Sequence, residues 1–149
     1  MGLSVRDDPK KAVDVAGREW GEPVKGLALS VLLKSRLHDD ELPTICVAIH
    51  NRSAETQHLT TRGWLSYFHI AVTGPDGVAV GMTPYGRELM KPERMPLASE
   101  VALTPGEAVE ADIPIGSIFD MRRGQFRVAA SCDVPGGGTI RSNEIQVKA

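Results

Sequence analysis

The stretch FHIAVTGPDGVAV, residues 68–80, shows the pattern that decides the fold class. In residues 68–72 every second side chain is large and apolar, which is the period of a strand with one buried face. The Gly-Pro-Asp-Gly sequence at 74–77 predicts a turn, because proline sets φ and glycine accepts the left-handed conformation. Residues 78–80 are then expected to run back as a hairpin partner.

The same alternation returns in other short runs, with turn-forming residues between them. Buried parallel strands would show continuous apolar runs, so alternation predicts antiparallel sheets with one wet face. Two such sheets bury their apolar faces against each other, which predicts an all-β sandwich of about seven strands; a closed barrel is the alternative. We expect one helical turn at 115–121, and Pro105-Gly106 lets a strand bend or bulge. The other runs are 27–33, 45–49, 101–113, 126–130 and 145–147.

Length and composition exclude several classes of protein. The chain has 149 residues, which suits one domain with a core of its own. Seventeen basic and 19 acidic side chains give a net charge of −2, which argues against a dedicated nucleic-acid binder. Two cysteines are too few for a disulfide scaffold. No apolar run approaches the roughly 18 residues that a membrane span needs, so no membrane-spanning segment is expected.

The beginning of the chain predicts an arm rather than part of the sheet. Residues 1–25 form this arm or linker, and 26–149 form the sandwich. Within the arm, residues 8–17 have the cap, the early proline and the terminal glycine of a short helix, and Trp20 is expected to pack on the domain. No secretory signal is visible; a cytoplasmic protein and a trimmed exported domain both stay open.

Several segments, in this order and spacing, carry a resemblance to a known family. They are 20–27 (WGEPVKGL), 46–53 (CVAIHNRS), 68–77, 103–107 (LTPGE), 119–128 and 142–145 (SNEI). This succession, over residues 20–148, resembles the bacterial immunoglobulin-like sandwich domains that include intracellular proteinase-inhibitor-like proteins and accessory domains of exported proteins. The resemblance implies an immunoglobulin-like fold, and either an accessory binding role or proteinase inhibition.

In that fold the two cysteines lie in the strands that hold the disulfide of antibody domains. Cys132 shares its face with Phe126 and Val128, which point inward, whereas Cys46 points away from its apolar neighbours Val47 and Ile49. A disulfide needs Cβ atoms about 3.8 Å apart with facing vectors. The phase of the two residues therefore predicts two free thiols.

Catalytic and metal-binding patterns are absent from the sequence. The histidines His38, His50, His58 and His69 have none of the close spacings of zinc ligands. Residues 39–41 lack the alternating oxygens and the turn glycine of a calcium loop. No nucleophile elbow, phosphate-binding loop or dinucleotide motif occurs. We therefore expect a protein that is not an enzyme and holds no cofactor and no metal.

Residues 82–96 interrupt the alternation, because their prolines exclude a long helix and a central strand. A loop this long is usually functional or disordered, and it contains residue types that serve at interfaces. Alternatively, Leu89 and Met95 fold back over a sheet edge, and both readings stay open. In immunoglobulin-like connectivity this loop shares one end of the sandwich with residues 52–62 and the Gly-rich loop at 136–138. The candidate partner-binding residues are Tyr85, Arg87, Leu89, Met90, Arg94, Arg52 and His58.

The sequence therefore predicts a non-catalytic module that binds a protein partner, or has an accessory role, by displaying loops from a rigid sandwich. It is expected to be a monomer or a weak oligomer and to bind no nucleic acid. The alternative is a proteinase inhibitor, in which one exposed loop enters a protease cleft in extended form.

Overall fold

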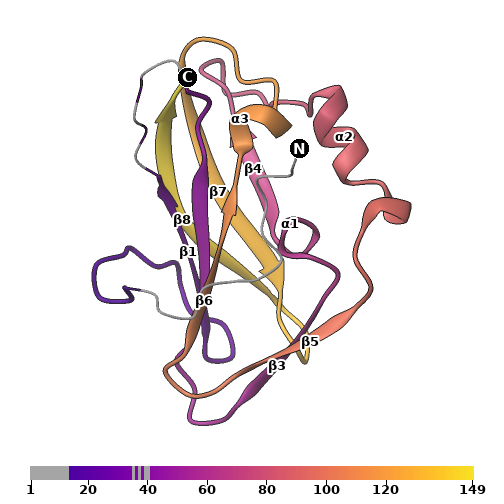
Figure 1. Ribbon diagram of the computed structural model, residues 1–149. Helices are drawn as coiled ribbons and strands as arrows, with labels where there is room; N and C mark the ends of the chain where they lie inside the picture. Colours follow the sequence, from indigo (N-terminus) through magenta and orange to yellow (C-terminus); the bar gives the residue numbers. More distant parts are fainter. Residues whose placement is uncertain (1–13, 35, 37, 39–40) are drawn as a thin grey trace.

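The protein is built mainly from antiparallel β-strands (Figure 1), as the alternation predicts. The computed structural model describes residues 14–34, 36, 38 and 41–149. Its strands are β1 (Leu27–Leu33), β2 (Ile45–Asn51), β3 (Gln57–Thr61), β4 (His69–Thr73), β5 (Ser99–Leu103), β6 (Ala108–Ile113), β7 (Gln125–Asp133) and β8 (Thr139–Lys148). The helical segments are short: α1 (Trp64–Tyr67), α2 (Pro84–Leu89), the 3-10 turn η1 (Pro92–Arg94) and α3 (Ile115–Ile118). None of these helices is long and apolar enough to cross a membrane.

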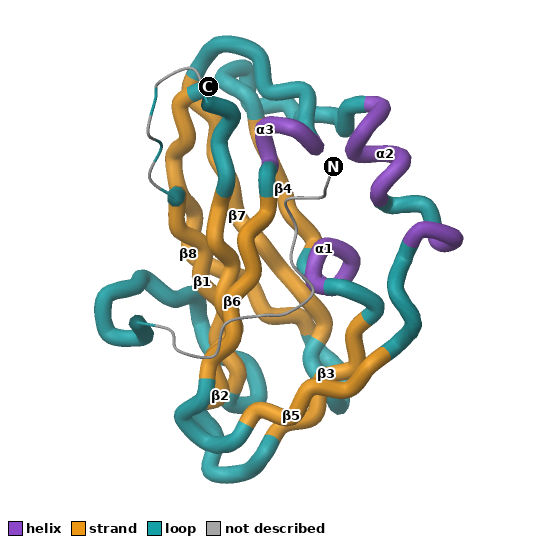
Figure 2. The backbone as a smooth tube through the Cα atoms, in the orientation of Figure 1, coloured by secondary structure: helices purple, strands orange, loops and turns teal. Residues whose placement is uncertain are grey.

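The strands form two three-stranded sheets and one two-stranded sheet. The orders are β1-β2-β6, β4-β7-β8 and β3-β5, and every pair is antiparallel. β1 and β8 lie side by side where the two larger sheets meet (Figures 1 and 2). The opposite edges of these sheets are therefore β6 and β4.

The core draws on side chains from both larger sheets. Along β7, Phe126, Val128, Ala130 and Cys132 are buried, and the residues between them are more exposed. This alternation follows from the pleat, which points successive side chains to opposite faces. Leu29, Val47 and Val109 from one sheet and Val72, Val128 and Val147 from the other belong to one cluster of buried residues. Trp64 and Phe68 extend this cluster at α1, with ring centroids 5.3 Å apart.

Residues 101–113 do not form one bent strand, so that prediction is wrong. A turn at Pro105-Gly106 separates β5, which pairs with β3, from β6, which pairs with β2. Gly106 has φ +85°, the left-handed region that favours glycine. The region 52–62, expected as a loop, contains β3. Only Leu59 and Thr61 of β3 are buried, so its apolar signal is weak.

The arm packs on the outer face of the β1-β2-β6 sheet. The Trp20 ring lies 5.4 Å from the His50 ring, and its indole N–H donates to the Val15 carbonyl at 3.0 Å. Trp20 thus fastens the arm to the sheet, as expected. Most of the helix predicted over 8–17 lies outside the described residues; within it, Asp14 accepts a hydrogen bond from the Gly17 amide at 3.1 Å.

Both cysteines are free and buried, and they point to different faces. Cys132 belongs to the core, whereas the Cys46 thiol lies on the outer face under the arm, 3.1 Å from Glu110 Oε2. Arg18, whose side chain is 4% exposed, donates to the same carboxylate oxygen at 2.9 Å. The phase of the two residues in the sequence therefore predicted their orientation correctly.

Candidate functional site

The strap, as we name residues 82–96, runs along one side of the molecule from α3 to β5 (Figure 1). Its beginning is joined to the segment that follows β6. Met82 forms a β-bridge with Phe119, and the Thr83 amide donates to the Ile118 carbonyl at 2.8 Å. The Thr83 hydroxyl donates to the Ser117 carbonyl at 2.7 Å. These bonds fix one end of the strap.

The helix α2 forms at this end because its sequence supplies a cap and an early proline. Thr83 Oγ1 accepts from the Gly86 amide at 3.0 Å, and Pro84 occupies the first turn. Gly86 is buried against α3, where a Cβ atom would lie 2.3 Å from the Ile118 carbonyl oxygen. The close approach of α2 to α3 therefore requires glycine at this position.

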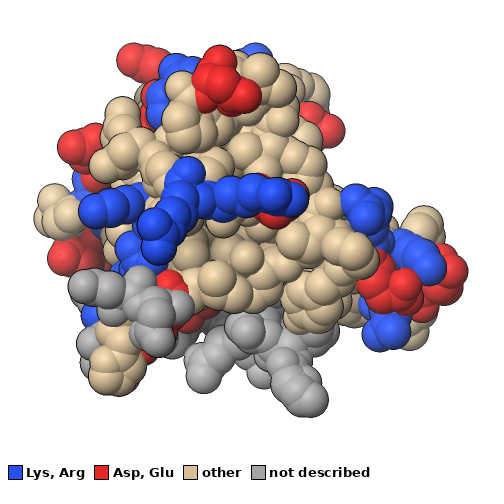
Figure 3. All heavy atoms as spheres, turned by 90° about the horizontal axis from the view of Figure 1, so that it is seen from above, with Lys and Arg blue, Asp and Glu red and all other residues tan. Residues whose placement is uncertain are grey.

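The far end of the strap is also held to the body of the protein. The Arg62 guanidinium donates to the Pro96 carbonyl at 3.1 Å and to the Pro92 carbonyl at 3.4 Å. Between the two ends, Glu88 forms ion pairs with Lys91 at 2.9 Å and Arg94 at 3.1 Å. The hydrogen bond from Lys91 lowers the pKa of the Glu88 carboxyl, with a further contribution from Arg94. Charges of both signs lie together on this side (Figure 3).

A groove of about 380 Å³ lies between the strap and β4, and we name it the β4 groove. One wall is β4 itself, residues 69–73, and its lower part includes Leu65 and Phe68. The other wall is made by residues 79–82, Met90, Ile118 and Phe119. These side chains are mainly apolar, and two are methionines, which adapt easily to the shape of a ligand. The groove can accept apolar side chains of a partner.

The structure distributes the candidate partner-binding residues over several places. Tyr85 and Arg87 lie on α2; the Tyr85 side chain is exposed, and Arg87 Nη1 donates to the Met82 carbonyl at 2.6 Å. Leu89 packs against the core, whereas Met90 lines the β4 groove. Arg94 lies on η1. Leu89 thus packs on the body of the protein, and Met90 faces a groove; contact of the strap with a partner stays a prediction.

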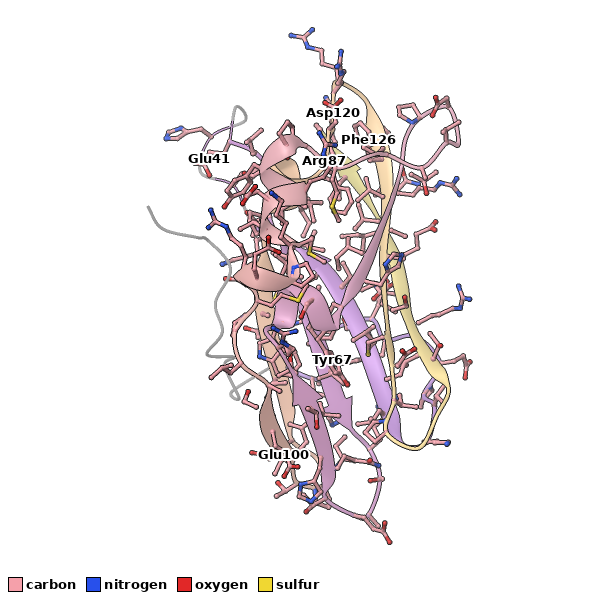
Figure 4. All side chains as sticks on the ribbon, turned by 90° about the vertical axis from the view of Figure 1, so that its right-hand side faces the viewer. Glu41, Tyr67, Arg87, Glu100, Asp120 and Phe126 are labelled. Carbon is pink, nitrogen blue, oxygen red and sulfur yellow. The ribbon has the colours of Figure 1, made fainter. Side chains whose placement is uncertain are left out.

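Arg52 and His58 do not join this group. Arg52 lies over the Trp20 ring, 5.5 Å from its centroid, and His58 on β3 approaches Glu100 on β5 at 3.2 Å. Figure 4 shows Arg87 near one end of the molecule and Glu100 at the other. The strap begins near the first of these ends, and the chain continues after it to β5 at the other, which the sequence-based connectivity did not anticipate.

Burial shifts the pKa of both thiols and of His50. In the part of the chain that the structure describes, no group of three or more His, Cys, Asp or Glu could hold a metal ion. Burial raises the pKa of the Cys46 thiol to about 12, and burial likewise raises that of Cys132 to about 12. Both sulfurs stay protonated at neutral pH, so neither is an activated nucleophile. Burial lowers the pKa of His50, and the nearby Arg52 lowers it further.

Sequence reasoning missed the residues that make the groove, above all Met82, Ile118, Phe119 and the β4 backbone. The alternation in 68–72 indicated a strand, but it did not indicate that this strand lies at a sheet edge. No protein-family model matches the chain, and no match is found among curated proteins.

Proposed function

We propose that this protein is a non-catalytic binding module that engages a protein partner at the β4 groove. The observation that carries the proposal is the groove itself, an apolar depression of about 380 Å³ next to a strap that is fixed at both ends. Ligand sites typically have volumes of about 300–1,000 Å³ and mainly apolar linings. A fixed wall also reduces the entropy lost on binding.

We also propose that the fold is an immunoglobulin-like sandwich, which would fit a display role. In that fold strands A, B and E share one sheet and C, F and G share the other. The orders β1-β2-β6 and β4-β7-β8 match this division if β1 is strand A and β8 is strand G. The match supports the resemblance seen in the sequence. On this assignment the β4 groove would lie beside strand C.

The proteinase-inhibitor alternative fits the strap less well. A loop that enters a protease cleft must be extended, whereas residues 84–89 are helical and Glu88 ties α2 to η1. We therefore favour binding at the groove over insertion of the strap into another protein.

Selection from a displayed library of random dodecapeptides tests the proposal. We expect peptides that bind the native protein and lose about tenfold or more of their affinity for Met90→Glu, because binding would cover the new carboxylate with apolar groups in the groove. The matched control is Leu97→Glu, which adds the same charge at a side chain that is 89% exposed and lies outside the groove lining. Thermal unfolding verifies that both variants fold. If every selected peptide binds both variants equally well, the groove is not the binding site.

A further inference from the structure

The edge of β4 that faces the groove carries backbone groups that no other described residue pairs. β4 pairs on its other side with β7, from His69↔Ser131 to Thr73↔Arg127. On the groove side, the Val80 amide donates to the Val72 carbonyl at 2.9 Å, and the Gly74 amide donates to the Val78 carbonyl at 2.9 Å. The hairpin segment 78–80 thus covers one half of this edge only.

In the described part of the chain the other half has no neighbouring strand, because the chain turns away after Val80. Backbone groups of alternate residues point to the same side of a strand, so Ile70 points to the groove as Val72 does. Within the described residues, neither the Ile70 amide nor its carbonyl has a hydrogen-bond partner, and the Val72 amide has no acceptor. Next to Val80, residues 81 and 82 leave β4 and bond to residues 119 and 120 instead.

An uncovered edge of this kind is a template for another strand. The edge suits a strand better than a helix. A helix satisfies its backbone groups internally, whereas an extended segment presents donors and acceptors that can pair with the β4 edge. Three residues of a strand extend over about 10 Å and leave alternate side chains for the apolar wall.

The charge at the rim indicates one more feature of the occupant. Arg87 bonds to the carbonyl of Met82, a residue of the groove wall, and forms no ion pair with the described acidic residues. Lys91 and Arg94, in contrast, both pair with Glu88. A carboxylate on the occupant would give Arg87 a partner.

We propose that the β4 groove receives an extended segment of a partner protein, which adds to β4 as a further strand through Ile70 and places an acidic residue beside Arg87. This inference rests on the proposed function and names the kind of partner that the groove takes. The partner's backbone supplies the hydrogen bonds that Ile70 lacks, and its alternate side chains lie against Phe68, Met82 and Met90.

Amide hydrogen exchange of the native protein, measured by NMR, tests this inference. The probe is an acetylated heptapeptide of alternating threonine and valine that ends in glutamate, added up to about 10 mM, well above the Kd range of weak peptide complexes. We expect the Ile70 amide to exchange about tenfold more slowly with the peptide. A twin peptide, N-methylated at the central residues, should bind about tenfold more weakly, because it cannot donate the backbone bonds. The test needs no protein variant, so loss of folding cannot imitate the result.

The acidic residue is tested by replacing the peptide's glutamate with glutamine. This change should weaken binding to the native protein by about threefold and leave binding to Arg87→Gln unchanged, as expected for one exposed ion pair. An equal loss for both proteins would remove Arg87 from the proposal.

Other outcomes would overturn strand addition. In one such outcome, groove-dependent peptides are selected from the library, but the heptapeptide leaves the exchange rate of the Ile70 amide unchanged and its N-methylated twin binds with the same affinity. The groove then binds proteins by another mode, and the proposed function stands. If no groove-dependent peptide is selected, the proposed function fails as well. If Ile70 is already protected without peptide, the occupant is either a second copy or the chain itself. If dilution removes the protection of the Ile70 amide, the occupant is a second copy. If deletion of residues 1–13 removes it, the occupant is the chain itself.

Discussion

The β1/β8 seam and the β4 edge differ in how their backbone groups are paired. At the seam, the Asn143 side chain of β8 bonds both backbone groups of Val31 on β1, at 2.8 Å and 3.0 Å. The arm continues this cover, since Gly21 donates to the Leu29 carbonyl and Val24 exchanges two bonds with Leu27. On the other side Ile70 has no such partner among the described residues.

This difference distinguishes a strand edge that is closed for stability from a strand edge that can bind a partner. Buried backbone groups are paired in nearly all native proteins, so the closure of the seam is what stability requires. The β4 edge lies in a groove that water reaches, and leaving it unpaired costs less. An edge that no described residue pairs, beside an apolar wall, is available to a partner.

The largest expected effect comes from opening the seam. Asn143→Ala leaves the amide and carbonyl of Val31 without their partners in a part-buried position, and it should lower the free energy of unfolding by about 2–4 kcal/mol. Urea denaturation measures this loss. The control is Gln146→Ala, an exposed position on the same strand, which should change stability by less than about 0.5 kcal/mol. If the two substitutions have equal effects, the Asn143 bridge does not close the seam.

A smaller effect is expected from the wall of the groove. Gly86→Ala forces a methyl group against the Ile118 carbonyl and should destabilise the protein by about 1–3 kcal/mol, as overpacking does. Because α2 must then move away from α3, peptide binding at the groove should weaken as well. For stability the matched control is Gly81→Ala, where the added Cβ meets nothing within 4 Å. Because Gly81 itself lines the groove, peptide binding to Gly86→Ala is compared with the native protein. Thermal unfolding of both variants and peptide titration of Gly86→Ala measure the two effects. An unaltered Gly86→Ala protein would contradict the close packing of the helices.

The smallest effect is expected from alkaline pH. Both thiols have a folded-state pKa of about 12, raised from about 9 by burial. The unfolded chain therefore loses these protons first, so their contribution to stability is complete below pH 9 and is lost as the pH rises from 9 toward 12. By pH 10 the loss should be about 1 kcal/mol for each thiol.

Cys46→Ala and Cys132→Ala distinguish how much each thiol contributes to this loss of stability. Cys46 is the thiol under the arm, and Cys132 is the thiol in the core. Urea denaturation between pH 8 and pH 10 should give each variant a shallower decline than the native protein, by about 1 kcal/mol at pH 10. The same decline in all three proteins would show that these thiols do not titrate as their burial implies.

The sequence predicts on which face of a strand a side chain lies better than it predicts which strands pair. Alternation placed Cys46 on the outer face and Cys132 in the core, because the pleat alone decides on which face a side chain lies. It did not reveal that Pro105-Gly106 separates strands of different sheets, or that β3 pairs with β5. Pairing depends on contacts between residues far apart in the chain, and a short polar strand such as β3 carries little apolar signal.

The candidate site was predicted only in part for the same reason. The prolines of the strap and its interface-type residues identified the segment, and Met90 does line the groove. Arg52 and His58 were grouped with it on expected loop positions, yet the strap leads away from them toward α3. The open edge at Ile70 could not be found from the sequence, because an edge is defined by the absence of a neighbouring strand.

Amide exchange of Val31 and Ile70 in the free protein tests the central contrast most directly. Both residues lie on strands at a sheet edge, and both are largely buried, with 1% and 8% of their surface exposed. If the seam is closed and the β4 edge is open, the Ile70 amide should exchange at least about tenfold faster than the Val31 amide under native conditions. Equal protection of the two amides would contradict the account, because the β4 edge would then already be paired.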